Sequence, residues 1–74
     1  MSRSNTGDFY SALGRALGEA RENRGYTQAQ FARALGLAQS TYGGYEAGQR
    51  KIPVHMLKKA AEKLNVSLDS LLSL

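Results

Sequence analysis

The sequence of 74 residues contains no cysteine and only one histidine, His55. The absence of cysteine excludes a disulfide framework and a thiolate zinc site. His55 has no cluster of carboxylates near it in the sequence, so we assign it no metal role and expect it to be solvated. No apolar run is long enough to span a membrane or to form the core of a signal peptide. We therefore expect a cytoplasmic protein with no membrane partner.

The residue patterns on which catalysis usually depends are also absent. The sequence shows no carboxylate pair placed for acid–base chemistry and no nucleophile with its base. It also has no glycine-rich phosphate loop followed by Lys and Ser or Thr. We therefore expect no enzymatic activity and no cofactor.

What the chain does have is a small size and an excess of positive charge. Ten Lys and Arg against six Asp and Glu give a net charge of +4 and a pI near 9.8. This balance suits a polyanionic partner, although many small domains are basic. A chain of 74 residues forms one small domain whose core is only marginally stable, so dimerisation would help it.

Two short helices separated by Gly36 are the most informative feature of the sequence. Thr27 can cap the first helix while the Gln30 side chain returns to the Thr27 amide, which is a capping box. Tyr26 precedes the cap and can pack on Phe31 as a hydrophobic staple. Gly36 follows the last apolar residue of this helix, as a left-handed terminator does. The pattern is a helix-turn-helix signal.

The second helix of the pair, expected over about residues 38–46, has a small and polar outward face. Tyr42 and Tyr45 fall at inward positions, with hydroxyls able to reach the surface. An amide such as Gln39, near the start of an exposed helix, can pair bidentately with adenine in the major groove. The candidate base-contacting residues are Gln39, Ser40, Thr41, Gly43 and Gly44. The helix-turn-helix then spans about residues 27–46.

The chain before this motif predicts one arm and one helix. Residues 1–7 are polar and lack periodicity, so we expect a flexible N-terminal arm. A helix is expected over about 8–24, with Asp8 as its cap and Gly25 as its terminator. Its core face comprises Phe9, Leu13, Ala16, Leu17 and Ala20.

After the motif, the pattern predicts two further helices. Pro53 opens a helix with a regular apolar stripe, and Asn65 can end it in the left-handed conformation. Ser67 then caps a last short helix that is rich in leucine. Its leucines either turn into the core or lie partly at a two-fold interface, for which the candidates are Leu68, Leu71, Leu72 and Leu74. The whole predicts an all-α, compact bundle of about five short helices in residues 8–74.

Several motifs in a fixed order carry a resemblance to a known family. They are Arg21, the TQ pair Thr27 and Gln28, the LG pair Leu35 and Gly36, YEAG from Tyr45 to Gly48, Pro53, and the ending LNVSLDSLL. In these motifs the chain, from about Leu13 to Leu72, resembles the lambdoid phage repressor and Cro superfamily, also called the XRE-type helix-turn-helix family. The resemblance implies a lambda-repressor-like fold, an internal ion pair between Arg21 and Glu46, and a dimer formed through the C-terminal end.

The same resemblance implies a second kind of DNA contact. In the family, the loop after the recognition helix lies against the sugar-phosphate backbone, and here that loop contains Gln49, Arg50 and Lys51. Together with the start of the preceding helix near Gln28, these residues would grip phosphates without reading sequence. The alternative is a solvated basic turn.

Gly43 and Gly44 depart from the family pattern, because many relatives carry polar or basic side chains there. Each glycine costs about 1 kcal/mol of helix propensity relative to alanine. Ala38 offers no capping oxygen, at a further cost of about 1 kcal/mol. Two explanations compete: the glycines let the helix backbone approach the groove closely, or this surface has lost direct readout of bases.

These expectations lead to two hypotheses from different classes. The first is a sequence-specific, double-stranded DNA-binding transcriptional regulator of repressor or controller type that acts as a homodimer. The alternative is a protein-interaction module of the same fold, antitoxin-like or polymerase-associated, with weak or no specific DNA binding. The glycine pair favours the alternative, whereas Gln39 followed by Arg50 and Lys51 favours the first. A steep loss of nucleic-acid affinity with added salt discriminates between them.

Overall fold

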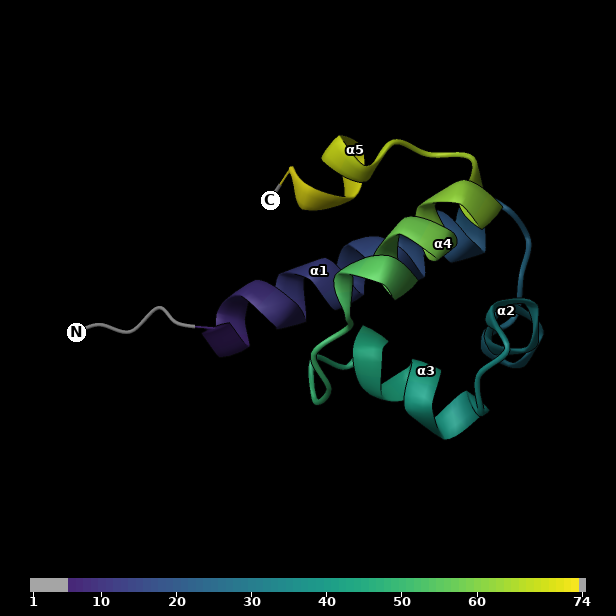
Figure 1. Cartoon of the computed structure of the whole chain (residues 1–74), viewed down its shortest axis with the longest axis horizontal. Helices are drawn as coiled ribbons and strands as arrows, with labels where there is room; N and C mark the ends of the chain where they lie inside the picture. The colour runs from purple at the N-terminus through teal and green to yellow at the C-terminus, as the bar shows by residue number, and fades with distance from the viewer. Residues whose placement is uncertain (1–5, 74) are drawn as a thin grey trace.

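The computed structural model describes residues 6–73, and five helices account for most of them. These helices are α1 (Thr6–Asn23), α2 (Gln28–Leu35), α3 (Gln39–Glu46), α4 (Val54–Leu64) and α5 (Leu68–Leu72). Residues 6–73 contain no strand. The prediction of an all-α bundle of short helices is confirmed (Figure 1).

The long helix α1 is the element around which the others are arranged. It contacts α3 and α5, while α2 contacts α3 and α4, and α4 also contacts α5. In Figure 1, α5 lies above α1 and α3 lies below it. The helix-turn-helix formed by α2 and α3 is therefore supported by α1, which contacts α3, and by α4, which contacts α2.

The predicted local chemistry at the start of α2 is present in full. The Gln30 amide donates to Thr27 Oγ1 over 3.0 Å, and the Thr27 amide donates to Gln30 Oε1 over 2.9 Å. The Tyr26 and Phe31 rings pack with their centroids 5.0 Å apart. Gly36 ends the helix with a φ of 76°. The capping box, the staple and the left-handed terminator are all confirmed.

The other helix ends follow the sequence with one small difference. Gly25 has a φ of 83° after α1, and Asn65 has a φ of 57° after α4, so both adopt the predicted left-handed conformation. Ser67 Oγ accepts a hydrogen bond of 3.0 Å from the Ser70 amide and caps α5. Pro53 is the N-cap of α4 rather than its first residue.

The N-terminal end of α1 corrects three expectations. The helix begins at Thr6, so Asp8 lies inside it and is not its cap. Of the predicted arm, residues 6 and 7 are helical and residues 1–5 lie outside the described part of the chain. Phe9 is 42% exposed and is not a core residue. It packs edge-on against Tyr10 instead, because this end of α1 extends past the other helices (Figure 1).

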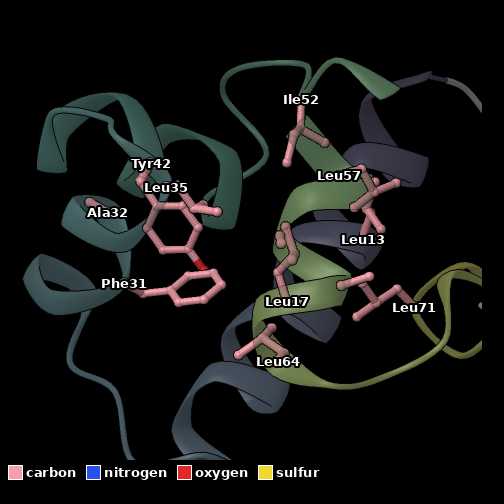
Figure 2. Close-up of a cluster of buried hydrophobic side chains, with 12 residues drawn as sticks. Leu13, Leu17, Phe31, Ala32, Leu35, Tyr42, Ile52, Leu57, Leu64 and Leu71 are labelled. Atoms are coloured by element: carbon pink, nitrogen blue, oxygen red, sulfur yellow. The ribbon is translucent and has the colours of Figure 1, made fainter. Parts of the chain in front are cut away.

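The core lies where α1 and α4 meet the helix-turn-helix, and α5 adds Leu71 to it. Figure 2 shows Leu13 and Leu17 of α1 against the leucines of α4, with the Phe31 and Tyr42 rings on the helix-turn-helix side. Those two ring centroids are 5.3 Å apart, in an edge-to-face arrangement. The buried apolar residues are Leu13, Leu17, Phe31, Ala32, Leu35, Tyr42, Ile52, Leu57, Ala60, Ala61, Leu64 and Leu71.

Helix α5 separates the predicted interface leucines into different environments. Leu71 is only 2% exposed and packs in the core, so its prediction as an interface residue is wrong. The side chain of Leu71 is already covered within one chain. Leu68 is partly buried against the core and Leu72 is 39% exposed. Leu74 lies outside the described residues.

Candidate nucleic-acid interface

The first turn of α3 presents polar side chains to solvent. Gln39 and Ser40 are exposed, and Thr41 is half-buried. Ala38 provides no side-chain hydrogen bond at the start of this helix. Tyr42, whose ring is completely buried, ties α3 to the core one residue after the polar turn. Tyr42 thus fixes this short, poorly capped helix to the core.

The glycine pair of α3 does not form the open surface that the sequence suggests. Gly44 is buried, and a Cβ atom placed on it would lie 2.8 Å from Arg50 Cδ. Gly43 is half-buried, and a Cβ atom there would lie 3.4 Å from Gln28 Oε1. The prediction that Gly44 contacts DNA bases is corrected on this ground, because the Arg50 side chain covers it.

The basic loop after α3 folds back onto that helix. The Gly44 carbonyl accepts hydrogen bonds from the Gln49 amide at 2.9 Å and from the Arg50 amide at 3.1 Å. Gly48 permits this reversal with a φ of 75°. Gln49, Arg50 and Lys51 are all exposed. The three predicted phosphate-contacting residues of the loop therefore stand next to the C-terminal half of α3.

Gln28 has a structural contact that the sequence did not reveal. Its Nε2 donates to Glu46 Oε1 over 3.0 Å, which joins the start of α2 to the end of α3. A hydrogen bond between residues 18 positions apart leaves no local signal in the sequence. The contact fixes Gln28 beside Gly43, while its second amide hydrogen stays available to another acceptor.

Arg21 and Glu46 form the internal ion pair that the family resemblance implies. Arg21 Nε lies 2.7 Å from Glu46 Oε2, and Arg21 Nη2 lies 3.3 Å from Glu46 Oε1. Arg21 Nη1 also donates to the Tyr26 carbonyl over 2.7 Å. The Arg21 residue is only 8% exposed. The pair therefore joins α1, the loop before α2 and the C-terminal end of α3.

The environment shifts the pKa values of Arg21 and Glu46 in the directions that keep both charged, and that of Tyr42 in the direction that keeps it neutral. Burial of the Glu46 carboxyl opposes ionisation, but hydrogen bonds from Arg21 and Gln28 outweigh burial and hold the pKa of Glu46 below its ordinary value. The hydrogen bond to Glu46 raises the pKa of Arg21. Burial raises the pKa of Tyr42 far above that of a free phenol, so Tyr42 stays neutral.

The Glu46 shift predicts how stability depends on pH. Because folding lowers its pKa, Glu46 stabilises the fold fully above the unfolded-state pKa of about 4.3. This contribution is lost as the pH falls through the folded-state value. We expect the urea-unfolding free energy to fall in acid, and Glu46→Gln to be less stable at neutral pH but less sensitive to acid. Glu62→Gln is the matched control, since Glu62 is exposed on α4 and forms no salt bridge within the described residues. Equal acid sensitivity in the wild type and Glu46→Gln would contradict the assignment.

Residues 6–73 provide neither a metal-binding cluster nor a membrane-spanning helix. These residues hold no group of three or more His, Asp or Glu side chains placed to bind a metal ion. The only histidine, His55, is exposed on α4. No helix in this range combines the length and apolar character needed to cross a bilayer.

Comparisons with known proteins agree with this arrangement. A helix-turn-helix family model, HTH_3, matches residues 17–71. Over 58 residues the chain is 41% identical to YazB, an uncharacterized HTH-type transcriptional regulator of Bacillus subtilis (strain 168), covering 78% of this chain and 84% of YazB. It is 38% identical over 61 residues to the HTH-type transcriptional regulator ImmR of the same organism, covering 82% of this chain but 48% of ImmR.

The fold is also similar to that of a solved structure. The restriction-modification controller protein C.AhdI from Aeromonas hydrophila superposes with a TM-score of 0.78 at 32% identity. The superposition covers 84% of this chain and 94% of C.AhdI. On the family match and these similarities, the chain belongs to the HTH_3 helix-turn-helix family, the XRE or Cro/C1 type of DNA-binding transcriptional regulator.

Proposed function

We propose that this protein regulates transcription by placing α3 in the major groove of a specific duplex DNA site. The observation that carries the proposal is the position of Gln39 and Ser40 on the exposed first turn of α3, with the basic loop folded against the same helix. Gln39 is the reader with the clearest chemistry, since its amide can both donate to and accept from adenine. Ser40 and the half-buried Thr41 are secondary readers.

Phosphate contacts on both sides of α3 would set the docking angle. On one side, the amides of Gln28 and Ala29 at the start of α2 have no acceptor within their own helix and favour an anion, whereas the Gln30 amide is already capped by Thr27. On the other side, Arg50 and Lys51 are exposed and basic. Contacts of this kind position a protein on DNA without reading its sequence.

We further propose that the protein binds as a homodimer to a two-fold symmetric operator. Leu72 is 39% exposed near the C-terminal end, and Leu68 is only partly buried, so α5 retains apolar surface for a second copy. Two recognition helices related by a two-fold axis would read half-sites roughly 34 Å apart. The similarity to C.AhdI, a controller protein, supports a repressor or controller role.

Selection from random duplex DNA at near-physiological salt tests this function. A palindromic motif among the retained sequences is the expected result, and it would identify the operator and the symmetry together. Enrichment of no motif would overturn the proposal and favour a protein partner or non-specific DNA binding.

Substitutions on α3 and in the loop should separate reading from positioning. We expect Gln39→Ala to reduce discrimination between the selected site and a site with its adenine replaced, by about 1–3 kcal/mol. Lys51→Ala should instead weaken binding to both sites alike and lower the salt slope by about one. Fluorescence anisotropy at several salt concentrations measures both quantities. Unchanged discrimination in Gln39→Ala would show that Gln39 is not a base reader.

A further inference from the structure

The glycine pair of α3 is the departure from the family pattern that the proposed function leaves unexplained. A backbone exposed for close approach to DNA would require both positions to be uncovered. Gly44 is buried, and three atoms of one side chain surround the place where its Cβ would be. These are Arg50 Cδ at 2.8 Å, Cγ at 3.0 Å and Nε at 3.3 Å.

The stem of Arg50 therefore occupies the space that a side chain at position 44 would take. Its backbone is fixed at the same point, because the Arg50 amide donates to the Gly44 carbonyl over 3.1 Å. The Gln49 amide donates to the same carbonyl. Main chain and side chain thus both attach Arg50 to α3, although the residue remains exposed to solvent.

We propose that Gly44 is a positioning residue for Arg50, and that the Arg50 guanidinium replaces the side chain that the recognition helix lacks at position 44. The inference rests on the proposed function, since the guanidinium is directed to a DNA phosphate beside α3. A guanidinium held by packing loses less conformational freedom on binding than one on a free loop. It also presents a planar fork that matches phosphate oxygens.

Gly43 provides the matched comparison within the same helix. A Cβ atom at Gly43 would lie 3.4 Å from Gln28 Oε1, which is an ordinary van der Waals contact. Gly43→Ala and Gly44→Ala add the same methyl group at adjacent helical positions. Only the second displaces Arg50.

A double-mutant cycle between positions 44 and 50 tests the proposal. Gly44→Ala should fold at least as stably as the wild type, because alanine is the better helix former and the displaced atoms belong to a flexible side chain. Its affinity for the selected duplex should nevertheless fall by about fivefold, within the range for residues in contact. Arg50→Ala should lose about tenfold or more, and adding Gly44→Ala to it should cause no further loss. Gly43→Ala does not displace Arg50, so any change in affinity that it causes should be the same in the wild-type and Arg50→Ala backgrounds.

A second measurement requires no DNA. Nitrogen relaxation at Arg50 Nε should report an ordered side chain in the wild type and in Gly43→Ala, and a mobile one in Gly44→Ala. Additive losses of affinity, wild-type affinity in Gly44→Ala, or an already mobile wild-type guanidinium would each overturn the inference while leaving DNA binding intact. Failure of the wild type to bind any duplex in a salt-dependent manner would overturn the proposed function and this inference with it.

Discussion

Replacing Arg21 with alanine is expected to lower the free energy of unfolding by about 3–5 kcal/mol, because the substitution leaves the Glu46 carboxylate without its cation. The Glu46 side chain is only 12% exposed, so water cannot fully replace the guanidinium. The variant also loses the hydrogen bond from Arg21 Nη1 to the Tyr26 carbonyl. The N-terminal approach to α2 and the C-terminal end of α3 are weakened together.

This loss is large relative to the total stability of a small domain, about 4–11 kcal/mol for a chain of this length. Chemical denaturation followed by circular dichroism measures it. Arg15→Ala serves as the control, since Arg15 is an exposed arginine of the same helix and should cost little. Replacing both partners, as in Arg21→Met with Glu46→Met, should recover part of the loss because no charge is then left buried. A loss below about 1 kcal/mol in Arg21→Ala, as for a surface pair, would contradict this account.

Gly14→Ala is expected to destabilise the protein by about 2 kcal/mol or more, although alanine is the better helix former. Gly14 is buried where α1 crosses the end of α3. A Cβ atom there would collide with the main-chain carbonyl oxygens of Tyr45 and Glu46. A side chain can relieve such a collision by changing its rotamer, but main-chain atoms cannot. Helices α1 and α3 must therefore move apart.

Gly18→Ala is the matched control on the same face of α1. Its Cβ would lie 3.1 Å from Glu46 Oε1, so a carboxylate must yield by a few tenths of an ångström. Both variants gain the same helix propensity, so the difference between their thermal midpoints compares a collision with main-chain atoms with a displacement of the Glu46 side chain. We expect Gly14→Ala to melt clearly below Gly18→Ala. Equal midpoints would mean that the two helices have room to separate.

The features predicted correctly from sequence are those decided by near neighbours. The Thr27–Gln30 capping box and the left-handed Gly36 and Asn65 each depend on residues within a few positions. Their hydrogen bonds are made inside a single turn, so residue type and spacing determine them. The first residue of α1 was harder to predict from the sequence. This end of α1 extends past its neighbours, so it has no apolar face that marks where the helix begins.

The features missed are contacts between distant segments. Helical periodicity predicts that Gly44 lies on an exposed face of α3. Only the loop after α3, which folds back onto the helix, places the Arg50 side chain over Gly44. Leu71 and Leu72 are chemically alike, yet α5 turns the first into the core and leaves the second exposed. Periodicity over a helix of five residues is too short to decide between them.

Helix α3 has little helical preference of its own, and under the proposed function this links DNA recognition to folding. With no capping side chain at Ala38 and two glycines in eight residues, α3 takes its shape from the buried Tyr42 and from the ion pair at its end. The surface of α3 that we propose to read bases thus exists only while the whole domain is folded. The occupancy of an operator depends on the concentration of folded regulator. A substitution that lowers the stability of the fold lowers this concentration, and the occupancy falls with it. Substitutions far from the groove can then change gene expression without altering any contact to DNA.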